Sequence, residues 1–209
     1  MTSTTFSFAL LREGSSDDGL IPHLRELAVR SGLPEVFGTS RDYKGSVETL
    51  LRRISHENSS PSLIFVHRDA DSDSDANRRE QILSAASKVS LVAPVVPVVP
   101  IQELEAWLLL DEAAIRAAVG RPSGHEALDL PAGRSIEAMK SPKEILREAC
   151  VVASRTKGRR RDSELRKFSA RRRTLLERLD IDGPVRQLTA WQRLEQDIAL
   201  AVTQLLRSA

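Results

Sequence analysis

The first 110 residues alternate between two kinds of hydrophobic pattern. Short apolar or alternating runs, each followed by turn residues, predict strands at 5–11, 35–39, 63–66 and 91–99. Between them, apolar residues recur at three- and four-residue intervals, which predicts helices near 17–31, 47–54 and 76–88. This alternation predicts an α/β fold with a mainly parallel sheet flanked by helices.

Two of the predicted strands differ in how they would lie in the sheet. Residues 63–66 (LIFV) form a continuous apolar run, which is typical of a strand buried on both faces. Residues 91–99 are rich in valine but contain Pro94 and Pro97, and Pro100 follows. Because each proline removes a backbone donor, this segment is predicted to be an edge strand, with polyproline II as the alternative.

After Leu110 the hydrophobic pattern becomes helical. Helices are predicted at 112–119, 143–153 and 191–206, and the proline- and glycine-rich residues 120–133 are predicted to be a connecting loop. We therefore divide the chain into an α/β domain at 1–119 and a helical C-terminal region at 120–209 that packs on it.

The composition is that of a protein with its own hydrophobic core. The 209 residues are 41% hydrophobic and include one cysteine, Cys150, which forms no internal disulfide. The first residues lack the pattern of a signal peptide, and no apolar run approaches the roughly 18 residues of a membrane span. We therefore expect a cytoplasmic protein without a membrane anchor.

The formal net charge of +2 hides an asymmetry along the chain. Residues 155–173 hold ten lysines and arginines against two acidic residues, a local charge of +8 that leaves −6 for the rest. Such a segment can contact a phosphate backbone, an acidic partner, the protein's own acidic body, or solvent alone. Because the segment is almost free of aromatic residues, we expect contact with a nucleic-acid backbone rather than with stacked bases. The candidate residues are Arg159, Arg160, Arg161, Arg171, Arg172 and Arg173.

Acidic residues follow three of the predicted strands. Glu13 closes the first strand, Asp69 and Asp71 come directly after the LIFV strand, and Glu103 and Glu105 follow the proline-containing strand. Ligand sites of open α/β sheets lie beyond the carboxyl ends of the strands, so these side chains are expected to meet. Carboxylate oxygens suit Mg²⁺, and the sequence therefore predicts a divalent metal site at this edge.

The run from Asp69 to Asp75 places four carboxylates within seven residues. Asp73 and Asp75 are also good loop and helix-cap residues, and that interpretation is favoured for them. A calcium loop is an alternative, because Asp69, Asp71 and Asp73 have the spacing of its first ligands. Ser74 stands at the position where such loops have glycine, and a strand precedes the run where they have a helix.

Three acidic motifs occur in order along the chain, and together they resemble the Toprim domain shared by topoisomerases, primases and OLD-type nucleases. More closely they resemble a small stand-alone Toprim-like family of unknown function. The resemblance covers roughly residues 5–111. The motifs are 13–17 (EGSSD), 65–71 (FVHRDAD) and 103–111 (ELEAWLLLD).

The resemblance implies a Toprim-like fold and a Mg²⁺- or Mn²⁺-dependent site for phosphodiester chemistry. Asp69 and Asp71 would hold a metal, and Glu13 would bind it or act as general acid/base. Either Glu103 or Glu105 would complete a second metal position. One ion would activate water while the other neutralises charge on the leaving oxygen.

Two details of these motifs stay open. Asp17, a further candidate ligand, stands where the first motif commonly has glutamate, and its shorter side chain puts direct metal contact in question. Glu103 and Glu105 are two residues apart, so on a helix they cannot share a face and only one should point into the site. Trp107 is expected to pack in the core.

Lys44, His67 and Arg68 are candidate contacts for a scissile phosphate. Neither GxxxxGK[ST] nor GxGxxG occurs in the chain, so ATP hydrolysis would require a separate chain. By resemblance to the OLD-type branch, the expected function is a nuclease that works with a separate ATPase subunit in bacterial defence or DNA processing.

The alternative function is a non-catalytic module. It would keep the acidic cluster but bind nucleic acid or a larger subunit through the basic C-terminal region. The sequence leaves open whether the chain forms a homo-oligomer.

Overall fold

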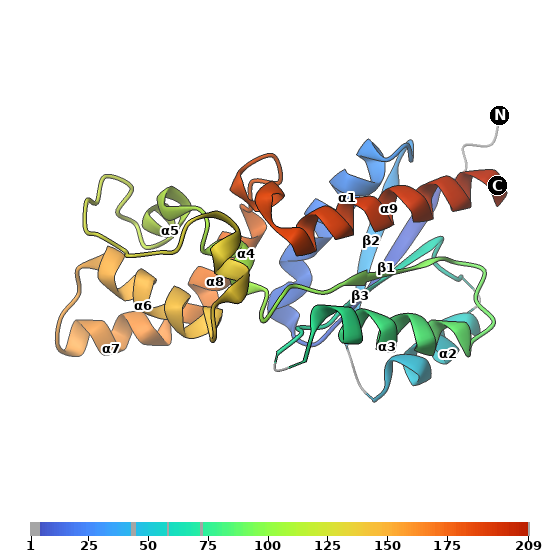
Figure 1. Cartoon of the computed structure of the whole chain (residues 1–209), viewed down its shortest axis with the longest axis horizontal. Helices are drawn as coiled ribbons and strands as arrows, with labels where there is room; N and C mark the ends of the chain where they lie inside the picture. Colours follow the sequence, from blue (N-terminus) through green and yellow to red (C-terminus); the bar gives the residue numbers. More distant parts are fainter. Residues whose placement is uncertain (1–4, 43–44, 58, 72, 209) are drawn as a thin grey trace.

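A parallel β-sheet forms the centre of the larger lobe of the protein (Figure 1). The computed structural model describes residues 5–42, 45–57, 59–71 and 73–208, and within them the sheet has four strands in the order β2-β1-β3-β4. The strands are β1 (Phe6–Arg12), β2 (Val36–Asp42), β3 (Leu63–His67) and β4 (Val95–Val98). The coarse prediction of an α/β fold with a parallel sheet flanked by helices is thus confirmed.

The two strands that the sequence distinguished take the places expected of them. Every residue of β3 is buried, and this strand pairs with β1 on one side and β4 on the other. β4 lies at the edge of the sheet, with Pro97 opposite Val66. An edge position leaves one side of the strand without a partner, so the missing proline donor costs no ladder hydrogen bond.

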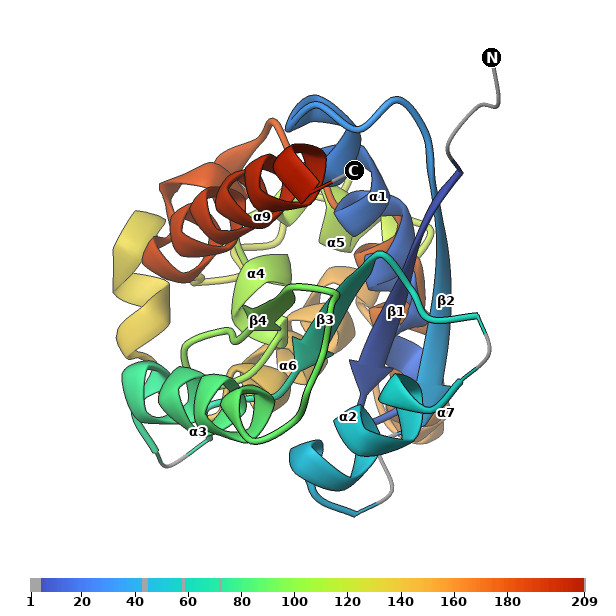
Figure 2. The same ribbon diagram turned by 90° about the vertical axis from the view of Figure 1, so that its right-hand side faces the viewer.

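Helices cover both faces of the sheet (Figure 2). α1 (Ile21–Arg30) and α9 (Thr189–Ser208) pack on one face, over β1 and β3 side chains such as Phe8 and Phe65. α2 (Val47–Ser55) and α3 (Asp75–Ser87) pack on the other, over Leu11 and Ile64. Within the described residues, no helix combines the length and the apolar character needed to cross a membrane.

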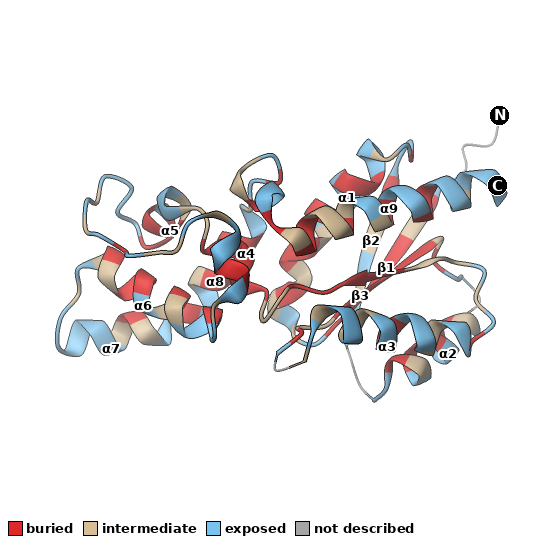
Figure 3. Cartoon of the chain, in the orientation of Figure 1, coloured by how far each residue is buried: buried red, intermediate tan, exposed pale blue. Residues whose placement is uncertain are grey.

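The remaining helices form a smaller lobe beyond the carboxyl ends of the strands (Figures 1 and 3). They are α4 (Glu105–Leu108), α5 (Glu112–Ala118), η2 (Gly133–Ala138), α6 (Pro142–Ser154), α7 (Arg159–Arg166), α8 (Phe168–Glu177) and η3 (Pro184–Gln187). The chain then returns through α9 to the sheet. Residues 120–209 therefore contribute to both lobes.

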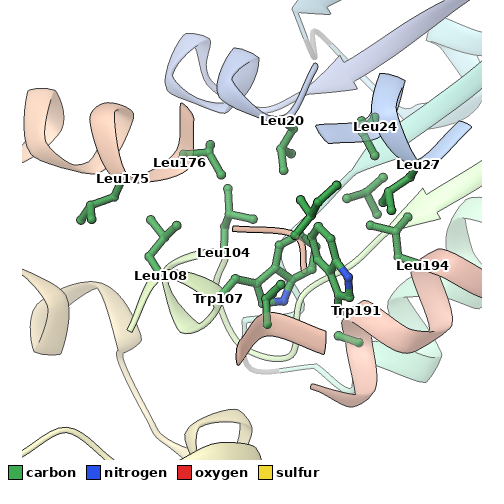
Figure 4. Close-up of a cluster of buried hydrophobic side chains, with 14 of the residues drawn as sticks. Leu20, Leu24, Leu27, Leu104, Trp107, Leu108, Leu175, Leu176, Trp191 and Leu194 are labelled. Carbon is green, nitrogen blue, oxygen red and sulfur yellow. The ribbon is translucent and has the colours of Figure 1, made fainter. Parts of the chain in front are cut away.

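One apolar cluster joins the two lobes (Figure 4). Trp107 of α4 and Trp191 of α9 are 1% and 0% exposed, and their rings meet edge to face with centroids 5.0 Å apart. Leu176 of α8 and Leu20, which precedes α1, belong to the same cluster. The prediction that Trp107 packs in the core is confirmed.

The boundaries of two predicted elements differ from those in the structure. The helix expected from about residue 17 starts with a 3₁₀ turn, η1 (Ser15–Leu20), and α1 begins at Ile21, with Pro22 in its first turn. Proline is favoured there because the first helical N–H groups have no partner within the helix. The strand predicted at 91–99 is shortened to Val95–Val98, between Pro94 and a turn that begins near Pro100.

Candidate functional site

The acidic residues of the three motifs gather between the two lobes, at the carboxyl ends of β1 and β3. Asp17 lies in η1 directly after β1, Asp69 follows β3, and Glu105 begins α4. Asp17 and Glu105 are buried, and the Asp69 side chain is 21% exposed. Two cationic side chains, from Arg172 and His67, connect these three carboxylates.

Arg172 reaches the acidic residues from α8. Its guanidinium donates from Nε to Glu105 Oε1 over 2.7 Å, from Nη2 to Asp17 Oδ1 over 3.0 Å and from Nη1 to Ser16 Oγ over 2.8 Å. The Arg172 side chain is only 9% exposed. The prediction that Arg172 contacts nucleic acid is therefore corrected, because its hydrogen-bonding groups are turned inward to carboxylates.

His67 lies at the end of β3 with 1% of its surface exposed. Its Nδ1 is 3.4 Å from Asp17 Oδ2, and its Nε2 is 3.6 Å from Asp69 Oδ1. Burial disfavours the imidazolium, but the two carboxylates outweigh burial and raise the pKa of His67 to about 10. Burial likewise opposes ionisation of Asp17, but His67 and Arg172 more than compensate and lower the pKa of its carboxyl. His67 is thus a buried cation rather than a phosphate contact.

Glu103 and Glu105 have different partners: Glu105 pairs with Arg172, and Glu103 lies near the charges of Glu105 and Asp69. The argument from helix faces does not apply, because α4 begins at Glu105 and Glu103 precedes it. Partial burial, together with the charges of Glu105 and Asp69, raises the pKa of Glu103. Glu103 Oε2 also accepts the backbone N–H of Lys143 over 2.9 Å, at the start of α6.

Glu13 and Asp71 lie closer to the surface. Glu13 Oε1 pairs with Arg68 Nε at 2.6 Å, and its side chain is 40% exposed. Asp71 has a left-handed backbone with φ of 52°, and its N–H donates to the carbonyl of Gln102 over 2.9 Å. This hydrogen bond holds the loop after β3 against the loop after β4, and Asp69 Oδ1 reinforces it by accepting the N–H of Leu104.

The charges of the site suit a divalent cation in part. When ionised, the carboxylates of Asp17, Asp69, Glu103 and Glu105 exceed His67 and Arg172 by two negative charges. An all-oxygen donor set is what Mg²⁺ and Mn²⁺ prefer. Across the residues that the structure describes, however, no group of three or more histidine, cysteine or acidic side chains is arranged to hold a metal. The metal site therefore stays a prediction from the sequence.

Asp69 and Glu103 lie outside the ion pairs of Arg172. Neither forms an ion pair with Arg172, and the second oxygen of each accepts no hydrogen bond from a described residue. Mg²⁺ commonly uses one or two carboxylates and completes its shell with waters and substrate phosphates. Arg172, in contrast, engages both Asp17 and Glu105.

The arginines predicted to contact nucleic acid differ in their surroundings. Arg159 and Arg160 are exposed on α7, and neither forms an ion pair with a described residue. Arg161 pairs with Glu148 at 2.7 Å, and Arg173 with Glu177 at 3.6 Å, although both remain about half exposed. Arg171 binds Glu164 and the carbonyl of Ala118. The predicted phosphate contact Lys44 lies outside the described residues.

Comparisons with protein-family models, with curated proteins and with solved structures found no match for this chain. The Toprim-like assignment therefore stays a prediction from the three motifs. The structure adds the coarser statement, a parallel α/β sheet with acidic residues at the carboxyl ends of its strands.

Proposed function

We propose that this protein is a divalent-metal-dependent phosphodiesterase of the Toprim-like kind that acts on nucleic acid. The observation that carries the proposal is the carboxylate cluster with an excess of two negative charges at the carboxyl ends of β1 and β3. Negative charge gathered in a partly buried place is unfavourable unless a cation offsets it. The pKa of Glu103 is raised first by burial, and the charges of Glu105 and Asp69 add to that shift.

Asp69 and Glu103 would hold the ion. When bound, a divalent cation would polarise a phosphodiester and lower the pKa of bound water. The chain's own residues fix the surroundings: Arg172 holds Glu105 and Asp17 in place, and the N–H of Leu104 orients Asp69. Arg68, paired with Glu13 at the surface of the site, places a guanidinium where a phosphate could approach.

Replacing Asp69 by asparagine should abolish the activity. The change keeps the shape and the acceptor for Leu104 N–H but removes a charge from the proposed ion site, so cleavage should fall by at least about 100-fold. We would assay single- and double-stranded DNA and RNA with Mg²⁺ or Mn²⁺. Asp73→Asn, in the loop before α3, is the matched control and should leave cleavage unchanged. Equal cleavage by Asp69→Asn and the wild type would contradict the proposal.

Nucleic acid should bind along the exposed face of α7. Removing one phosphate-binding cation lowers the salt dependence of binding by about 0.9 in the slope of log K against log salt. Replacing Arg159 and Arg160 together by glutamine should therefore weaken binding and reduce that slope by about 1.8. Fluorescence anisotropy with a labelled oligonucleotide at several salt concentrations measures both effects.

Arg53→Gln, which replaces an exposed arginine on α2 in the other lobe, should change neither the affinity nor the slope. An unaltered slope in the double variant would remove α7 from the binding surface.

The second candidate function is a non-catalytic module that binds nucleic acid or a protein partner. It is favoured by the ion pairs of Arg172, which leave Asp17 and Glu105 unavailable to a metal. Isothermal titration calorimetry measures whether Mn²⁺ binds, and the cleavage assay measures whether nucleic acid is cut. Together they distinguish the two functions. Binding of nucleic acid without cleavage in either metal favours the module.

A further inference from the structure

The two edges of the sheet differ in how open they are to further pairing. β4, at one edge, is four residues long, contains Pro97, and has α3 and α9 packed against it. β2, at the opposite edge (Figure 2), is seven residues long and has no proline. Among the described residues, the backbone of β2 pairs with β1 alone. Its other side therefore presents a row of N–H and C=O groups that another strand can pair with.

The side chains of β2 leave one face of this edge uncovered. Val36 and Gly38 lie on the face that packs on α1. Side chains alternate between the two faces of a strand, so the residues between them lie on the opposite face, as does the residue that precedes the strand. These four residues are all exposed, and the aromatic ring among them is 50% exposed: Glu35, Phe37, Thr39 and Arg41.

Residues 35–41 are complementary to a second copy of themselves that runs antiparallel. When Gly38 lies opposite Gly38 of the other copy, Glu35 lies opposite Arg41, and Phe37 lies opposite Thr39. The twofold symmetry makes each of these pairs occur twice. Opposite charges and aromatic side chains beside β-branched ones stabilise antiparallel strands when they lie directly across from each other. A register shift of two residues in either direction removes both charge pairs, so the charges select this register.

The intramolecular contacts of the two charged side chains are weak competitors. Glu35 Oε1 is 4.0 Å from Arg25 Nη2, and these side chains are 64% and 52% exposed. Arg41 Nη2 is 3.6 Å from Glu57 Oε2, and its Nη1 donates to acceptors within β2 itself. Exposed ion pairs of this kind add little to stability. Both side chains can therefore exchange these contacts for a partner strand.

We propose that β2 is a dimerisation surface whose partner is β2 of a second copy of this chain, paired antiparallel about a twofold axis at Gly38. The interface joins the two parallel sheets into one continuous sheet, which removes the open edge of both. Because the two strands run in opposite directions, the carboxyl ends of the two sheets, and with them the two acidic clusters, lie at opposite ends of the dimer. One strand from each copy buries less surface than a standard interface, so the dimer forms reversibly and depends on concentration.

The first test exchanges the charges and measures dimerisation of the full chain by sedimentation velocity, over roughly 10 μM to 1 mM protein. Arg41→Glu places like charges opposite each other in both pairs, and so does Glu35→Arg, so each should weaken the dimer at least about tenfold. The double variant Glu35→Arg/Arg41→Glu restores opposite charges and should dimerise as the wild type does. Glu80→Arg, a charge reversal at an exposed position on α3, is the matched control and should leave the dimer unchanged.

The second test uses the wild-type chain and does not depend on whether a variant folds. Hydrogen exchange of the outward-facing amides of β2 should slow at least about twofold from the lowest to the highest protein concentration, while exchange in α3 stays constant. A chain that stays monomeric throughout would overturn the inference and leave the edge to a different partner. A dimer that neither single reversal weakens, or that the double variant does not restore, would also overturn it, as would constant exchange in β2.

Discussion

Replacing Trp191 by alanine should lower the free energy of unfolding by about 3–5 kcal/mol, the range measured for large aromatic residues in protein cores. The Trp191 side chain is fully buried, and its ring packs edge to face on Trp107. Its removal would leave a cavity where α9, α4 and the sheet meet, because Leu194 and Leu104 belong to the same cluster. Urea denaturation followed by circular dichroism measures the loss.

Leu200 offers a matched control on the same helix. Its side chain is 70% exposed, so Leu200→Ala should change the free energy of unfolding by less than about 0.5 kcal/mol. A decrease below about 1 kcal/mol for Trp191→Ala would contradict the view that this aromatic pair joins the lobes. Since Glu105 lies two residues before Trp107, the tryptophan variant should also disturb the Arg172 ion pair.

The sheet could be predicted because its strands have local signatures. The run at 63–66 is apolar on both faces, and the prolines near 91–99 indicated an edge, so β3 and β4 were recognisable without any knowledge of their partners. Parallel strands place their carboxyl ends on one side of a sheet, which led to the prediction that Glu13, Asp69, Asp71, Glu103 and Glu105 meet. In the structure Asp17 takes the inner position after β1, and Glu13 lies closer to the surface.

The partners of these carboxylates could not be predicted in the same way. Arg172 is one of ten basic residues in the segment 155–173, and the pattern of that segment does not distinguish the side chain that turns inward from those that remain exposed. The choice depends on how α8 docks, which is set by distant apolar contacts such as that of Leu176 with the core. The helix-face argument could not choose between Glu103 and Glu105, because Glu103 precedes α4 and lies outside any helix.

The structure also accounts for part of the charge asymmetry along the chain. Arg161, Arg171 and Arg172 each pair with a glutamate or aspartate of the same molecule. Contact with the protein's own acidic residues was one of the alternatives that the sequence left open, and for these residues it is the observed one. The surface that remains for a phosphate backbone is centred on Arg159 and Arg160.

The stability of the protein should fall steeply in alkaline solution because of His67. Its pKa is raised to about 10 in the folded protein, against an ordinary value of about 6.5. A raised pKa stabilises the folded state fully below pH 6.5, and the stabilisation is lost as the pH rises from 6.5 to 10. The loss amounts to as much as about 5 kcal/mol. Asp17, with its lowered pKa, contributes in the opposite sense, because its stabilisation is lost below its ordinary pKa.

Unfolding by urea at pH 6, 8 and 10 measures the effect of His67, with His67→Gln as the test variant. Glutamine retains a polar side chain but cannot carry the charge, so the variant should be less stable at pH 6 and should lose most of the alkaline slope. His56→Gln, at an exposed position after α2, should keep the slope of the wild type. Parallel loss of stability by the wild type and His67→Gln between pH 6.5 and 10 would show that His67 is not the buried cation that links Asp17 to Asp69. The excess negative charge of the site would then be larger than two, because His67 would be neutral.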